Sequence, residues 1–250
     1  MKGRMLVLLA VFSVLFMMMP VVSARHKNES KVDKILYVPL DNRPIADKQT
    51  TEAIQKLGYQ VVVPPENMLG DQQNLGNPDE LWTWIEKNAP DADAAVVSSD
   101  SMLYGSLVGS RKHEYSKQEI LSRAEKFQTF RKEFPKLPLY VFSSIMRTPR
   151  SGEASGHEEP AYYRSYGSDI FRYTLLRDKA EVEGLTRREK KEQAFLEQLI
   201  PENDLSDWLG RREKNFAANK TLISMTRANV FNYLALGRDD NAPYSQTHLE

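Results

Sequence analysis

Ile35-Leu-Tyr-Val-Pro-Leu-Asp-Asn-Arg-Pro44 is the stretch from which the fold class is predicted. Its first half is a short apolar, partly β-branched run, which is typical of a strand buried on both faces of a parallel sheet. The run ends in Asp41, Asn42 and Arg43, and Pro44 prevents further ladder pairing. Because parallel α/β proteins carry their chemistry at the carboxyl ends of their strands, these three polar side chains are the first candidates for a site.

Four further apolar runs along the chain are predicted as strands, at Tyr59–Val63, Ala92–Ser98, Leu139–Ser143 and Phe231–Leu236. Helical segments separate them, and their start signals are explicit. Asn77 stands before Pro78 as a helix cap, and capping boxes occupy Ser116–Glu119 and Thr186–Glu189. Strands that alternate with helices predict an α/β fold with a parallel sheet and outer helices. Five such units correspond to a partial (β/α)-barrel-like arrangement or an open sheet.

The region between the fourth and fifth strands breaks this alternation. It holds three helical stretches and no convincing strand, so a helical insertion is predicted over residues 150–229. The first stretch carries a stripe of aromatic side chains, Tyr162, Tyr163, Tyr166 and Tyr173. Such a stripe either packs against the rest of the protein, which is the more common use, or stacks on sugar rings as part of a lid.

The N-terminus has the features of an export signal. Residues 1–24 combine Lys2 and Arg4 with an apolar core and a small-residue site ending at Ala24, and they are predicted to be a signal peptide. Residues 25–33 are polar and are predicted as a linker, followed by the α/β domain at 34–250. The expected location is therefore the cell envelope or the exterior, with no stable membrane span after cleavage. The uncovered last predicted strand leads us to expect that the domain is the front part of a longer protein.

Charge and cysteine content exclude several classes of function. Removing residues 1–24 takes two of the 34 basic residues and none of the 34 acidic ones, so the mature chain has 32 basic residues and a net charge of about −2. That balance gives no electrostatic basis for nucleic-acid binding. The chain has no cysteine, which excludes thiolate nucleophiles and cysteine-ligated metals. It also lacks the sequence signatures of serine hydrolases, dinucleotide-binding proteins and P-loop proteins.

Four acids follow predicted strands and are expected to converge at one edge of the sheet: Asp41, Asp100, Asp239 and Asp240. Two carboxyl groups that flank a glycosidic bond act as acid and as base or nucleophile. A cluster of three carboxylates can instead hold a hard divalent cation; apart from that alternative, no cofactor is expected. The structural alternative is that these acids cap helices or bind loop amides.

The remaining candidates are groups that would position a ligand. Arg43 and Arg147 lie at strand ends, where a guanidinium group either binds a carboxylate or phosphate or neutralises a neighbouring acid. Asn42, Tyr104 and Asn241 complete this set; Tyr104 opens a segment to Gly109 that is predicted to be a loop. Two histidines in predicted loops, His113 and His157, are expected to be solvated.

Several of these motifs, taken together, resemble a bacterial family known only as domain-of-unknown-function family 4127. The resemblance is carried by Val38-Pro-Leu-Asp-Asn-Arg-Pro44, Asp100-Ser-Met-Leu-Tyr-Gly105, Ser144-Ile-Met-Arg-Thr148 and Gly237-Arg-Asp-Asp-Asn241. Ser110-Arg111, Glu159-Pro-Ala-Tyr-Tyr163 and Arg211-Arg-Glu-Lys-Asn215 look like further motifs of the family, whereas Ser106 departs from the glycine expected after Gly105. The resemblance extends from about Lys34 to the end and implies no activity.

The function predicted from these residues is an exported hydrolase that acts on glycans. Asp100, Asp239 and Asp240 are its catalytic candidates. The substrate-binding set is Asp41, Asn42, Arg43, Tyr104, Arg147 and Asn241. Two alternatives use the same strand ends: a metal-assisted phosphoester hydrolase and a non-catalytic envelope module that binds a small molecule or glycan.

Overall fold

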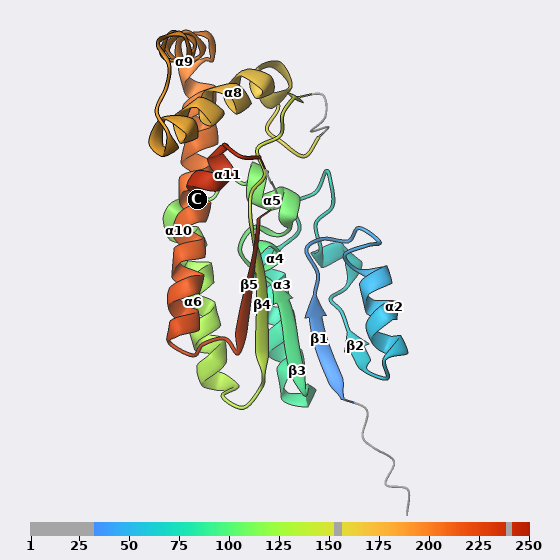
Figure 1. Cartoon of the computed structure of the whole chain (residues 1–250). Coiled ribbons are helices and arrows are strands. Elements are labelled where there is room, and N and C mark those ends of the chain that lie inside the picture. The colour runs from blue at the N-terminus through green and yellow to red at the C-terminus, as the bar shows by residue number, and fades with distance from the viewer. Residues whose placement is uncertain (1–32, 153–156, 239–241) are drawn as a thin grey trace, which may run out of the picture. The chain divides into compact units, whose positions relative to one another are not determined.

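The computed structural model describes residues 33–152, 157–238 and 242–250. These residues are built around a five-stranded parallel sheet in the order β2-β1-β3-β4-β5 (Figure 1). The strands are β1 (Lys34–Val38), β2 (Gln60–Val62), β3 (Ala94–Ser98), β4 (Leu139–Ile145) and β5 (Tyr233–Arg238). The predicted class, a parallel α/β sheet with outer helices and a helical insertion, is confirmed.

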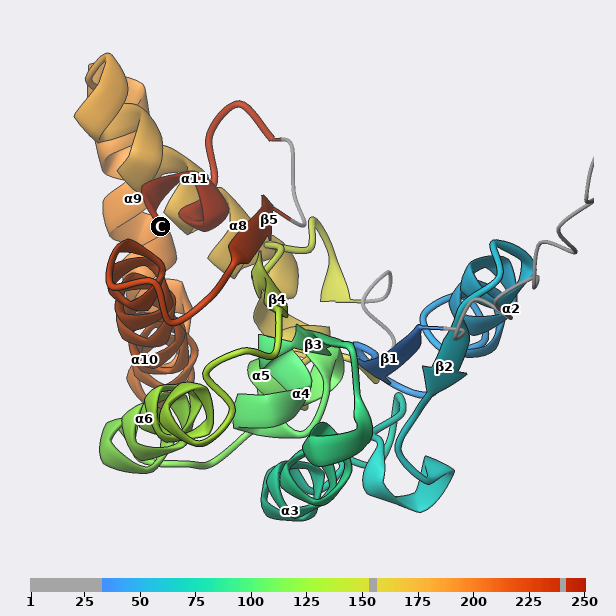
Figure 2. The ribbon, with the colours of Figure 1, turned by 90° about the horizontal axis from the view of Figure 1, so that it is seen from below.

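The strand order determines which helices cover which face. β2 pairs with one side of β1, and the next strand along the chain, β3, pairs with the opposite side of β1. In a (β/α) barrel, by contrast, strands that are consecutive in the chain are neighbours in the sheet. With right-handed crossovers this reversal puts α2 on one face and the other crossover helices on the opposite face, as Figure 2 shows. These helices are α2 (Lys48–Lys56), α3 (Pro78–Asn88), α6 (Lys117–Glu133) and α10 (Glu202–Arg227). The reversal between β1 and β3 is a topological switch point, where open α/β sheets bind ligands beyond the carboxyl ends of their strands.

The main core lies between the sheet and α3, α6 and α10. The helices place their aromatic side chains against one another, with the Trp82 and Phe127 rings 4.7 Å apart in an edge-to-face arrangement. The indole N–H of Trp82 donates to the carbonyl of Met102, so this large side chain is buried without an unpaired donor. Burial of this apolar surface holds the helices on the sheet.

A second apolar cluster lies in the helical insertion. It joins α8 (Tyr163–Val182) and α9 (Arg187–Leu199) to the first half of α10, around Tyr163, Leu196 and Trp208. The second half of α10 contributes Ala218 and Leu222 to the main core. This one helix therefore serves both as the crossover between β4 and β5 and as the support of the other two helices (Figure 1).

The helix caps predicted at Asn77, Ser116 and Thr186 are confirmed, and each depends on residues close in the sequence. The side chain of Asn77 accepts from the backbone N–H groups of Asp79 and Glu80 at the start of α3. Both capping boxes, Ser116 with Glu119 and Thr186 with Glu189, have their reciprocal hydrogen bonds. Each removes orphan donors from a helix N-terminus.

The segment predicted as a loop at Tyr104–Gly109 is helical over most of its length, and that prediction was wrong. It contains the end of α4 (Ser99–Tyr104) and the start of α5 (Leu107–Lys112). The two helices turn at Gly105, where φ is +95° and an added Cβ would lie 2.1 Å from the carbonyl oxygen of Leu75. The small residues thus permit close packing between backbones rather than flexibility.

β5 is exposed along most of its length among the described residues. Tyr140 on β4 and Tyr233 on β5 are neighbours in register, and they are 41% and 61% exposed. The remaining short helices are η1 (Glu66–Met68), η2 (Ala89–Asp91) and α11 (Gln246–Leu249). Within the described ranges no helix combines the length and apolar character needed to cross a membrane.

Candidate functional site

Asp41 and Arg43 form an internal ion pair directly after β1. The Asp41 carboxylate is fully buried and accepts from the backbone N–H of Arg43 at 3.1 Å and from its Nε at 2.9 Å. The Arg43 Nη2 atom lies 2.7 Å from the same carboxylate. Asp41 therefore fixes the orientation of a guanidinium group whose side chain is 32% exposed. Asn42 is tied to the next loop, since its N–H donates to the carbonyl of Gly70.

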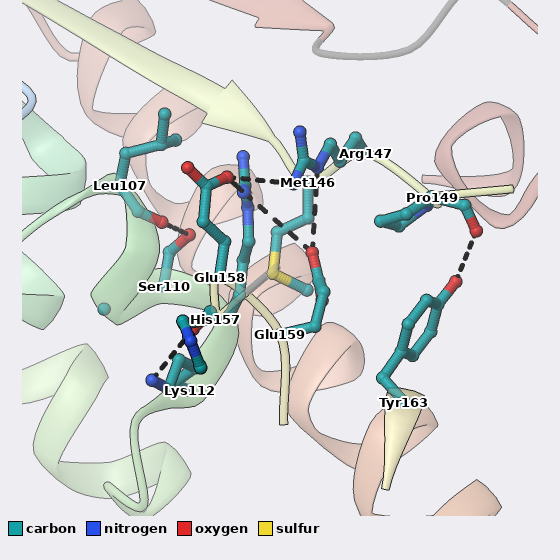
Figure 3. A network of polar contacts seen from close by, with 12 residues as sticks. Leu107, Ser110, Lys112, Met146, Arg147, Pro149, His157, Glu158, Glu159 and Tyr163 are labelled. Atoms are coloured by element: carbon teal, nitrogen blue, oxygen red, sulfur yellow. Dashed lines mark hydrogen bonds and ion pairs between the residues drawn. The ribbon is translucent and has the colours of Figure 1, made fainter. Parts of the chain in front are cut away.

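Three arginines that are far apart in the sequence surround the carboxylate of Glu158. Arg111 Nη1 and Arg147 Nη2 lie 2.8 and 2.9 Å from Glu158 Oε2, and Arg43 Nη1 lies 3.3 Å from Oε1. They come from the end of β1, from α5 and from the end of β4. We call Arg43, Arg111 and Arg147 the arginine cage. Figure 3 shows Glu158 beside Arg147, with the Glu159 side chain next to it.

Glu159 lies against the same cage but is less completely paired. Its Oε1 atom is 3.7 Å from Arg147 Nε and 3.9 Å from Arg111 Nη1, which is too far for a hydrogen bond, and it has no other partner. The side chain is only 4% exposed. Burial raises the pKa of Glu159 to about 7, because the loss of hydration outweighs the attraction of Arg111, Arg147 and Arg212. A carboxyl group with such a pKa is suited to donate or accept a proton near neutral pH.

A pocket of about 360 Å³ opens beside Glu159. Its lining consists of Lys112, His157, Glu159, Pro160, Ala161 and Arg164. Lys112 is held in place by a hydrogen bond from its Nζ atom to the carbonyl of His157, also visible in Figure 3. Among the described contacts neither Lys112 nor Arg164 has an acidic partner, so the pocket presents basic groups around one carboxyl group. Its electrostatic character therefore favours an anionic ligand.

Asp100 lies in the first turn of α4, next to β3, and is almost fully buried. Its Oδ2 atom accepts from the backbone N–H of Ser144 at 3.2 Å and from the Ser144 hydroxyl at 3.0 Å. These bonds join the ends of β3 and β4. They match the structural alternative for a strand-end acid, a carboxylate that binds loop amides.

Tyr104, assigned above to substrate binding, lies in the main core. Burial raises the pKa of its phenol well above the usual value, with a smaller contribution from the charge of Asp100. The expectation that His113 is solvated was wrong: this ring is fully buried and stacks between Tyr104 and Tyr115. Its Nε2 atom lies 3.0 Å from Asn215 Oδ1, and burial lowers the pKa of His113 to about 4. His157 is exposed, as expected.

The tyrosine stripe is used for packing, the more common of its two interpretations. Tyr163 is fully buried, stacks on Trp208 and donates its hydroxyl to the carbonyl of Pro149 (Figure 3). Tyr173 is also buried in the second cluster. Tyr162 donates to Asp207 at 2.7 Å. These partners hold the insertion together.

The structure brings together only part of the predicted site. Asp41, Arg43 and Arg147 meet in one network of ion pairs, whereas Asp239, Asp240 and Asn241 lie outside the described residues. Within the described ranges no group of three His, Asp or Glu side chains is arranged to hold a metal ion.

Three residues of the network had no role in the sequence-based site: Arg111, Glu158 and Glu159. The charged residues of the sequence contained a signal for these three residues. The strand ends carry arginines, and two adjacent glutamates precede Pro160 in a long connection. Buried guanidinium groups require acidic partners, which would have pointed to these glutamates.

The chain was compared with known protein families, curated proteins and solved structures. The model of the family described as "Protein of unknown function (DUF4127)" matches residues 35–250. No curated protein and no solved structure matches.

Proposed function

Since the chain belongs to the DUF4127 family, whose function is unknown, we propose an activity from the site itself: an exported hydrolase of acidic glycans, with Glu159 as its general acid. The observation that supports this most directly is the buried Glu159 carboxyl group, which lines a pocket and has one oxygen without a hydrogen-bond partner. A carboxyl group that is protonated near neutral pH is what protonation of a glycosidic oxygen requires.

The pocket around Glu159 supports an acidic substrate rather than a neutral one. Lys112 and Arg164 add positive charge at its wall. A carboxylate or sulfate on a sugar would be attracted to both, and the remaining lining residues leave room for an apolar ring face.

Glycoside hydrolysis also requires a second carboxylate. The sequence offers Asp239 and Asp240, which directly follow β5, and β5 pairs with β4, the strand that precedes Arg147. In this proposal one of them is the base or nucleophile. Asp100 becomes a positioning residue, because its carboxylate is already used by Ser144.

The basic pocket also favours a second candidate of a different class, a non-catalytic envelope module that binds an acidic glycan. Metal-assisted hydrolysis of a phosphoester stays a further alternative, since arginine and lysine bind phosphate as well. Loss of turnover with retained binding separates an enzyme from a binder, and sensitivity to a chelator identifies the metal-dependent route.

The experiment compares wild type with Glu159→Gln on a panel of polyuronides, sialylated glycans, sulfated glycans and phosphodiesters, with and without EDTA. We expect cleavage of an acidic glycan, and a loss of about 10²–10⁴-fold in turnover by Glu159→Gln with binding retained. Glu192→Gln is the matched control, because Glu192 pairs with Arg172 in the insertion. Equal turnover by Glu159→Gln and wild type would contradict the proposal, as would binding of the panel without cleavage by either.

A further inference from the structure

The arginine cage belongs to a network of ion pairs. Its three guanidinium groups face three acids among the described residues, Asp41, Glu158 and Glu159. Glu159 is partly protonated near neutral pH because burial raises its pKa to about 7. Glu159 is therefore the least completely paired acid of this network.

The geometry of the cage is that of an anion-recognition site. Guanidinium groups recognise carboxylate and phosphate through directional N–H donors, and here donors from three segments meet at one carboxylate. Asp41 orients the Arg43 guanidinium group by accepting a hydrogen bond from its Nε atom, which is the arrangement expected of a preorganised ligand-binding arginine.

The cage is reachable from solvent. Arg43 and Arg147 are about one-third exposed, and a pocket of about 390 Å³ reaches Arg43 between Asp71, Gln72 and Gln73. Glu159, which lines the other pocket, lies 3.7 Å from Arg147 and 3.9 Å from Arg111. Glu158 itself is 14% exposed, in contrast to Asp41, which is fully buried.

We propose that the arginine cage is a binding site for the carboxylate or phosphate group of a ligand, and that Glu158 is an internal competitor for that site. The carboxylate of Glu158 has the charge and the acceptor atoms of such a group, and it contacts each of the three arginines. Glu159 lies beside it with a buried Oε1 atom that has no hydrogen-bond partner and that a ligand in the cage would reach. This inference concerns binding alone and does not depend on the proposed hydrolase.

An internal competitor lowers the apparent affinity for the external ligand by the fraction of time for which it occupies the site. A tethered carboxylate acts at an effective concentration in the millimolar range. Removal of the Glu158 charge should therefore strengthen anion binding by tenfold or more. Removal of a cage arginine from the same variant should cancel that gain.

The test measures binding of D-glucuronate, inorganic phosphate and sulfate to the full chain by calorimetry. We expect Glu158→Gln to bind at least one probe tenfold or more tightly than wild type, and Glu158→Gln/Arg43→Gln to lose this gain. A preference for glucuronate assigns the cage to a carboxylate ligand, and a preference for phosphate assigns it to a phosphoryl group. Asp79→Asn is the matched control, because Asp79 pairs with two cations at the surface, and it should show no gain.

A second variant separates an effect on binding from a defect in folding. Glu158→Asp keeps the charge but withdraws the carboxylate by one methylene, and it should show a smaller gain in the same direction. The proposal is overturned if folded Glu158→Gln binds no probe more tightly than wild type. It is also overturned if neither variant folds, because Glu158 would then be a structural partner of the arginines. Turnover is not measured, so this outcome is separate from that for the proposed hydrolase.

Discussion

Replacing Glu159 by glutamine should change the pH dependence of stability in a direction that the structure fixes. Burial raises the pKa of this carboxyl group from its ordinary value of 4.5 to about 7. Below pH 4.5 the group is protonated in the folded and unfolded chains and has no effect on the pH dependence. Between pH 4.5 and 7 the unfolded chain loses its proton while the folded protein keeps it. The free energy of unfolding therefore falls as pH rises through this range.

The size of the effect follows from the two pKa values. At about 1.4 kcal/mol for each pH unit, the full interval corresponds to about 3 kcal/mol, of which about 2.5 kcal/mol falls between pH 5 and pH 8. Glutamine resembles the protonated acid in size and has no charge at either pH. Glu159→Gln should therefore gain about 2–3 kcal/mol relative to wild type when the pH is raised from 5 to 8.

Urea unfolding of both proteins at a series of pH values measures this difference. Other titrating groups affect both proteins alike, so the change in their difference isolates Glu159. Glu192→Gln is a useful control. Its ion pair with Arg172 is at the surface and lowers the pKa of Glu192, so its effect should be under about 1 kcal/mol and opposite in sign.

Parallel pH dependence of wild type and Glu159→Gln would refute this reasoning. It would mean that Glu159 is ionised in the folded protein and fully paired with Arg111 and Arg147. Its proposed role as general acid would then lose its physical basis, whereas the arginine cage would keep its role.

Two further predictions concern the frame that positions the site. Phe127→Ala removes a buried ring that packs edge-to-face on Trp82. It should lower the free energy of unfolding, measured by urea titration, by about 3–5 kcal/mol, with the full loss expected only if the surrounding core does not collapse into the cavity. Gly105→Ala should destabilise the protein by more than about 2 kcal/mol, because a positive φ is combined with a clash against Leu75. Gly58→Ala has a similar φ of +97° but open space, so it should cost only about 1 kcal/mol; equal losses would refute the clash.

The amino-acid sequence determined those features that depend on near neighbours in the chain. The apolar runs that became strands and the caps of α3, α6 and α9 are all readable locally, because each depends on residues within a few positions. The parallel α/β class follows from their alternation. Asp41, Arg43 and Arg147 could be proposed as neighbours because the carboxyl ends of parallel strands share an edge.

The strand order and the partners of the strand-end residues were decided only by the tertiary structure. Alternating strands and helices are equally compatible with the orders 1-2-3-4-5 and 2-1-3-4-5, since local sequence does not say on which side β2 pairs with β1. His113 was predicted to be a solvated loop residue, yet its ring contacts Asn215 of α10, 102 positions away in the sequence. Glu158 contacts Arg43 and Arg111 across 115 and 47 positions. Contacts over such distances arise from the packing of whole elements, and charge balance among buried groups then selects the partners.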